Sequence, residues 1–205
     1  MPIQIGAKSS TFSDPTGLLS DCHRRIETFM RTLSTAAEFE GRRLNDDEYR
    51  ALNTALQYFR DAAPKHNADE EESLFPRLRS LPDAEVQRAL ADVDRLEQEH
   101  RWATPLHMEV DRLGQQWLAN GELGRREADD FQVAVRRLAT MYRTHIEIED
   151  SVLFPLARRV LLPTQTAEIA AEMAKRRDVS GPVSQSIEVH AQDAPGCRDR
   201  EDRNG

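Results

Sequence analysis

The feature that most constrains the fold of this chain is a short motif that occurs twice. Segments 66–76 and 145–155 share His, Glu, Leu, Phe and Pro at five positions in identical register. Within each copy the His and the Glu are four residues apart, which places both on one face of an α-helix, one turn apart. Five matches in register are poorly explained by chance, so the chain contains an internal duplication that carries helical structure.

The duplication extends toward the N-terminus of each copy. His23 precedes His66 by 43 residues, and His100 precedes His145 by 45. Each copy therefore has one His on an earlier helix and a His-Glu pair on a later one. The chain is predicted to consist of two copies of one helical hairpin.

Apolar residues at three- and four-residue steps predict four long helices, whereas period-two alternation and hairpin turns typical of strands are almost absent. Pro64 is expected to bend the second helix, and Pro105 to kink the third. Four helices with short connections favour an all-α, antiparallel up-down-up-down four-helix bundle. The expected helices span about residues 15–40, 45–76, 80–120 and 125–162.

The chain is expected to divide into three parts, of which the central one is the folded bundle. Residues 1–14 form an N-terminal segment and residues 15–162 the bundle. Residues 163–205 form a short amphipathic helix, from about 165 to 175, followed by a flexible polar tail. The tail is rich in Asp, Arg, Ser, Gly and Pro, a composition that is typical of disorder.

Six polar side chains are predicted to face the bundle interior, because each continues an apolar stripe on its helix. Burying four imidazoles and two carboxylates costs several kcal/mol per group unless something compensates them, and a cation does so most simply. Nitrogen and oxygen ligands of this kind suit Fe, Mn or Zn, and two carboxylates that can bridge favour two ions over one. The predicted ligands are His23, His66, Glu70, His100, His145 and Glu149.

Over residues 15 to 160 these motifs resemble the hemerythrin-like, or HHE cation-binding, domain family. The resemblance implies a four-helix bundle that holds two Fe ions, bridged by carboxylates and by an oxo or hydroxo group. It assigns one His to each of the first and third helices, and a His-Glu pair to each of the second and fourth.

The chain departs from the oxygen-carrying hemerythrins one turn after His100. Those proteins have a second His there, and this chain has Thr104. Each iron would then hold two His, two carboxylate oxygens and a bridging oxygen, which leaves one open position per ion. His107, two turns past His100, is an alternative fifth imidazole; its repeat equivalent, Met30, favours pocket lining instead.

Other residues near the motifs have simpler interpretations. Glu97 and His100 form the Glu-x-x-His signature of ferritin-like bundles, but no second copy of that signature exists. Cys22 and Tyr142 are expected to pack in the interior. The acids that follow the motif glutamates are expected on a solvated face, with a supporting role near the metal as the alternative; they are Glu71, Glu72 and Asp150.

Charge and hydropathy exclude some classes of protein. The net charge is −8, with 36 acidic against 28 basic residues, and the arginines are scattered, so nucleic acid is an unexpected partner. No window approaches the ~18 apolar residues of a membrane helix. The N-terminus lacks an export signal, and Cys22 and Cys197 are poorly placed for a disulfide, so a soluble, cytoplasmic protein is expected.

These expectations lead to a non-haem di-iron protein that binds or senses a small diatomic molecule, O2 or NO, or responds to redox state or iron supply. The first alternative is a di-iron enzyme acting on peroxide, NO or Fe(II). The second is iron storage, or iron donation for the repair of iron centres. Whether the protein is an enzyme, and which protein partner it has, stay open at the level of sequence.

Overall fold

The computed structural model describes residues 11–178, and all regular secondary structure in that range is helical. The predicted all-α class is therefore confirmed for this part of the chain. The predicted tail lies almost entirely outside the described residues, as do His190 and Cys197. The helices are α1 (Pro15–Ala37), α2 (Asp46–Asp61), α3 (Ala63–Ala68), α4 (Phe75–Arg79), α5 (Ala84–Asn120), α6 (Arg125–Ile148), α7 (Phe154–Val160), α8 (Pro163–Arg176) and two π-helical segments, η1 (Asp69–Leu74) and η2 (Glu149–Leu153).

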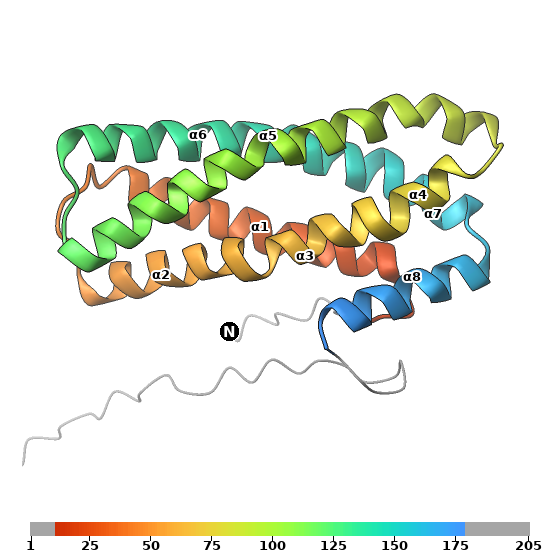
Figure 1. The fold of residues 1–205 in the computed structure, drawn as a ribbon, viewed down its shortest axis with the longest axis horizontal. Coiled ribbons are helices and arrows are strands. Elements are labelled where there is room, and N and C mark those ends of the chain that lie inside the picture. Colours follow the sequence, from red (N-terminus) through yellow and green to blue (C-terminus); the bar gives the residue numbers. More distant parts are fainter. Residues whose placement is uncertain (1–10, 179–205) are drawn as a thin grey trace, which may run out of the picture.

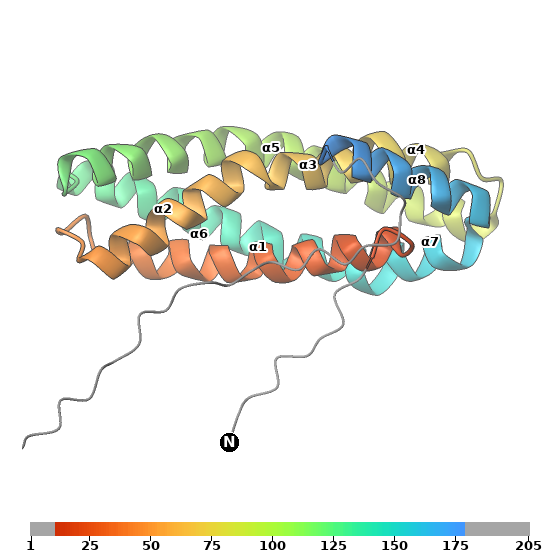
Figure 2. The same cartoon turned by 90° about the horizontal axis from the view of Figure 1, so that it is seen from below.

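The long helices pack around a shared interior. α5 packs against α6 and α2, and α1 packs against the same two helices (Figure 1). The short helix α8 lies at the end of the molecule where α4 and α7 are found, and it contacts η1 and α1 (Figure 2). Within residues 11–178, no helix combines the length and apolar character needed to cross a membrane.

The apolar core consists of two clusters with a buried polar zone between them. One cluster lies toward the α1–α2 and α5–α6 connections and includes Leu33, Leu52, Trp117 and Phe131. The other lies where α4, α7 and α8 meet and includes Phe75, Val93, Phe154 and Met173. On α1 and on α5 one histidine separates the two clusters, so the apolar packing on both sides fixes its position along the helix axis.

Helix α1 begins as predicted and ends earlier than predicted. The Asp14 carboxylate accepts a hydrogen bond from the backbone N–H of Gly17 at 2.9 Å, which caps the N-terminus. The helix was expected to reach residue 40 but ends at Ala37. After the helix, Glu40 and Gly41 have φ of 51° and 76°, a left-handed conformation that turns the chain toward α2.

The prolines act differently from one another. α2 ends at Asp61 and α3 begins at Ala63, so the helix is interrupted beside Pro64, where a bend was predicted. The predicted end near Pro76 is too early, because helical structure continues to Arg79. α5 remains helical from Ala84 to Asn120 through Pro105.

Candidate metal centre

Both copies of the motif form a π-helical turn at the glutamate. In η1 the backbone N–H of Phe75 donates to the carbonyl of Glu70, and in η2 that of Phe154 donates to the carbonyl of Glu149. The proline that follows each Phe has no N–H, and its ring would clash with the carbonyl four residues back, so a wider turn accommodates it. Single π turns inside α-helices are frequent at functional sites.

The structure brings all six predicted side chains together. They come from α1, α3, η1, α5, α6 and η2, and none is more than 5% exposed. They form two overlapping groups, and within each group one ligand atom per residue lies within 4.8 Å of the others. The groups are His23, His66, Glu70 and Glu149, and Glu70, His100, His145 and Glu149.

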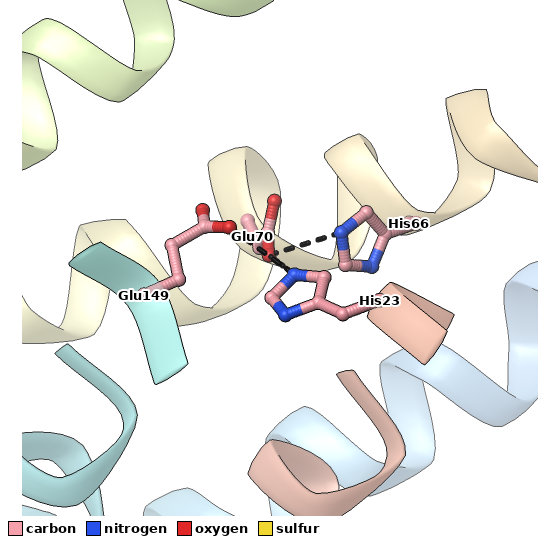
Figure 3. Close-up of side chains that lie close together, drawn as sticks. All are labelled: His23, His66, Glu70 and Glu149. Carbon is pink, nitrogen blue, oxygen red and sulfur yellow. Dashed lines mark ion pairs between the residues drawn. The ribbon is translucent and has the colours of Figure 1, made fainter. Parts of the chain in front are cut away.

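The first group is drawn in Figure 3, where both imidazoles point toward the carboxylates. The Nε2 atom of His23 lies 3.2 Å from Oε2 of Glu149 and 3.9 Å from Oε1 of Glu70. The Nε2 atom of His66 lies 3.4 Å from the same Oε1 of Glu70. Two nitrogens and two carboxylates therefore surround one point.

The second group repeats this arrangement on the other side of the glutamates. His100 Nε2 lies 3.6 Å from Oε2 of Glu70, and His145 Nε2 lies 3.3 Å from Oε2 of Glu149. Glu70 thus directs one oxygen to each group, as a bridging carboxylate does. The two Nε2 atoms of His100 and His145 are 3.0 Å apart.

A second set of acids orients three of the four imidazoles by hydrogen-bonding their Nδ1 atoms, on the side of each ring away from the cluster. Because ionised carboxylates accept hydrogen bonds and cannot donate them, the ring Nδ1–H donates, and Nε2 keeps its lone pair for the centre. His66 differs: its Nδ1 is buried and has no hydrogen-bond partner among the described residues. The three pairs are His23 with Asp150 (3.0 Å), His100 with Glu71 (2.7 Å) and His145 with Glu99 (2.9 Å).

These outer acids were only partly foreseen. Glu71 and Asp150 were expected mainly on a solvated face, yet each contacts a buried His of the other copy. Their shared place, one residue after the motif Glu, was a usable signal. Glu99 was missed, and nothing in its local sequence marks it. Glu97, the residue behind the ferritin-like alternative, instead pairs with Arg79 at 3.0 Å.

Several buried polar atoms of the cluster lack partners, which tests whether a cation fits. Both oxygens of Glu70, both oxygens of Glu149 and the Nε2 of His23 have no hydrogen bond among the described residues. Unpaired buried carboxylate oxygens are costly. Two nitrogen ligands roughly 2.1 Å from one ion lie about 3 Å apart when they subtend a right angle, which is the His100–His145 separation. A pair of cations therefore fits this donor set.

The pKa values of the cluster residues in the metal-free protein also indicate that bound cations would stabilise the site. Burial, followed by the charge of Glu149, raises the pKa of Glu70 well above its usual range. Burial also acts to raise the pKa of Glu149, but His145 and His23 outweigh it and lower that pKa. Burial acts to lower the pKa of His145, but interactions with Glu149 and Glu99 outweigh it and raise the pKa to about 9. Bound cations would replace these protons and leave both carboxylates charged.

His107 does not join either group and lies beside them. Its Nε2 forms a 2.8 Å hydrogen bond with the hydroxyl of Tyr142, and its ring stacks on Phe59 at 5.0 Å. Burial lowers the pKa of His107 to about 4. His107 and Tyr142 both line a cavity of about 310 Å³ that also touches His100 and Thr104. The pocket-lining interpretation of His107 thus agrees with the structure, and the fifth-imidazole alternative has no geometric support.

Comparison with known proteins agrees with this geometry. The hemerythrin HHE cation-binding domain family matches residues 14–157. The chain therefore belongs to the hemerythrin family, and the resemblance inferred from the motifs is confirmed. The chain is also 28% identical, over 176 residues, to a protein of Haemophilus influenzae (strain ATCC 51907 / DSM 11121 / KW20 / Rd) that is described as an uncharacterized protein; the match covers 83% of this chain and 94% of the relative.

Proposed function

We propose that this protein binds two Fe ions between its four histidines and two glutamates and uses them to bind or sense a small molecule. The observation that carries the proposal is the pair of overlapping donor groups that share both carboxylates. The antiparallel up-down-up-down order of the four long helical segments is part of the proposal. So are a cytoplasmic location and the absence of a nucleic-acid partner.

The protein's own contribution is to hold and orient the ligands. Iron supplies Lewis-acid and one-electron redox chemistry when it is bound. Glu70 and Glu149 would hold the ions and balance part of their charge, and the four imidazoles would supply nitrogen donors. Glu71, Glu99 and Asp150 fix three rings in the tautomer that directs Nε2 inward. The apolar clusters flank the site on both sides.

The cavity beside His100 supports access for a small ligand. Its walls combine apolar side chains such as Phe59 and Ala103 with the polar pair His107 and Tyr142. Among the six cluster residues, His100 is the one in contact with this cavity in the described part of the chain. A diatomic molecule such as O2 or NO would therefore approach the position held by His100 and His145.

The same cavity serves one alternative. Because it would also give peroxide, NO or Fe(II) access to the cluster beside His100, a di-iron enzyme that turns over one of these is the second candidate. Iron storage, or donation to damaged iron centres, is the third.

Anaerobic reconstitution with Fe(II), followed by metal analysis and Mössbauer spectroscopy, tests the proposal. We expect two irons per chain in the wild type and fewer than 0.2 in the Glu70→Gln/Glu149→Gln double variant. Glu147→Gln, which removes an exposed acid of α6, is the matched control and should retain both irons. Two irons in the double variant would refute the proposal. Stopped-flow mixing with O2 then separates binding, which gives a long-lived absorption band, from turnover, which gives repeated fast decay.

A further inference from the structure

The four imidazoles of the cluster are not supported equally. His23, His100 and His145 each hydrogen-bond a carboxylate through Nδ1, at distances of 2.7 to 3.0 Å. His66 is 2% exposed, and its Nδ1 has no partner among residues 11–178. The position formed by His23 and His66, the first position, thus has one outer acid. The position formed by His100 and His145, the second position, has two.

The repeat explains which acid is missing. Two outer acids occupy equivalent places, since Glu71 follows Glu70 and Asp150 follows Glu149, and each crosses to a His of the other copy. The third acid, Glu99, directly precedes His100 and serves His145. In the first copy the corresponding residue, directly before His23, is Cys22. The duplication therefore has an acid in one copy and a thiol in the other.

Cys22 cannot replace a carboxylate in this role. It is 8% exposed, and Nη2 of Arg25 lies 3.2 Å from its Sγ. A thiol is a weak hydrogen-bond acceptor. The Nδ1 of His66 therefore lacks the strong acceptor that raises ligand basicity and fixes ring orientation at the other three histidines.

We infer that the two metal positions are unequal and that the first position, His23 with His66, binds its ion more weakly because Cys22 stands where Glu99 stands in the other copy. This inference rests on the proposed two-metal function. Loss of an outer partner of a metal-bound His typically lowers affinity by about 10- to 100-fold. At metal concentrations between the dissociation constants of the two positions, the second position is filled and the first is mostly empty. That half-filled form would make the state of the protein depend on iron supply.

Single-position variants of the full chain test the inference without repulsion between two bound ions. His66→Ala leaves the second position intact, and His145→Ala leaves the first. Co(II) is titrated into each metal-free variant against a competing chelator, and the d–d absorption bands report the ligand set. We expect His66→Ala to bind one Co(II) about 10- to 100-fold more tightly than His145→Ala. Equal affinities, or the opposite order, would overturn the inference.

Exchanging the residues of the repeat sharpens the test. Glu99→Cys in the His66→Ala background copies the first position into the second and should remove the 10- to 100-fold advantage. Cys22→Ala in the His145→Ala background removes the thiol without adding an acceptor and should leave the affinity unchanged. If Glu99→Cys leaves the advantage in place, Glu99 is not its source and the inference fails. Failure of the proposed function is a different result, namely fewer than two Co(II) per wild-type chain.

Discussion

The two copies of the hairpin contribute the same residue types to the buried cluster, two His and one Glu each, but their surroundings differ. Both place a π turn over the motif glutamate. Helix α8 packs on η1 of the first copy. Several positions that are equivalent in register also differ in chemistry: Asp69 corresponds to Ile148, His107 to Met30, and Asn45 to Gly124. The comparison teaches that the motif determines local backbone and ligand geometry, while the surroundings determine stability and access.

The largest difference in stability is expected at Asp69. This carboxylate is fully buried and pairs with Arg176, at 3.0 Å, and with Arg177, both at the C-terminal end of α8. Removing one partner of a buried ion pair costs about 3 to 5 kcal/mol. Because both arginines keep some contact with water, Asp69→Ala should lower the free energy of unfolding of the metal-free protein by about 3 kcal/mol. Urea denaturation measures this change.

The equivalent position in the second copy provides the control. Ile148 is half-buried, so Ile148→Ala removes apolar contacts alone and should cost about 1 kcal/mol. Similar losses in the two variants would show that the contact between α8 and η1 contributes nothing specific.

Much of the fold follows from the periodicity of the sequence. The helix starts at Pro15 and Asp46 are marked by capping residues, and the apolar stripes place all six cluster residues inward. The continuation of helical structure past Pro76 was not foreseen. It depends on a π turn, which changes the hydrogen-bond register and so escapes a rule based on 3.6-residue periodicity.

The second comparison concerns His107 and predicts a dependence on pH. The folded pKa of His107 is about 4, against an ordinary value of 6.5, because burial disfavours the charged ring. The unfolded chain therefore binds this proton first as the pH falls. The stability that His107 contributes is fully present above pH 6.5 and is lost between pH 6.5 and 4, up to about 3 kcal/mol.

His107→Met copies the residue of the first copy and removes this titration. The variant is expected to be less stable than wild type at pH 7, because the Tyr142 hydroxyl loses its partner. Relative to wild type it should gain about 3 kcal/mol between pH 7 and pH 4. Urea denaturation of both metal-free proteins across this range measures the difference. A difference that stays constant with pH would show that His107 is protonated as easily in the folded protein as in the unfolded chain.

The candidate site was easier to predict than the residues around it. His66 and Glu70 are related by spacing on one helix, which a sequence displays directly. The contact between Glu99 and His145 joins two different helices, and its existence depends on how α5 and α6 are rotated against each other. No pattern within a single helix contains that information.

The smallest expected effect compares the starts of α2 and α6, 21 residues before the motif His in both copies. Asn45 accepts the backbone N–H of Glu48 at 2.9 Å, and the Glu48 carboxylate accepts the N–H of Asn45 at 2.9 Å. This capping box satisfies two N–H groups that would otherwise lack partners. Asn45→Ala should therefore cost about 1 kcal/mol.

The N-cap residue of helix α6 is Gly124, which has no side chain to accept a capping hydrogen bond. Its φ of −63° and ψ of 156° suit any residue, so Gly124→Asn introduces the missing cap without backbone strain. A Cβ there would lie 2.5 Å from Oε2 of Glu127, the far end of a flexible side chain that must move. The net gain should be a few tenths of a kcal/mol, measurable as a rise in the urea midpoint at unchanged slope. A loss of stability instead would mean that Glu127 cannot move aside, and that the second copy depends on glycine at this position.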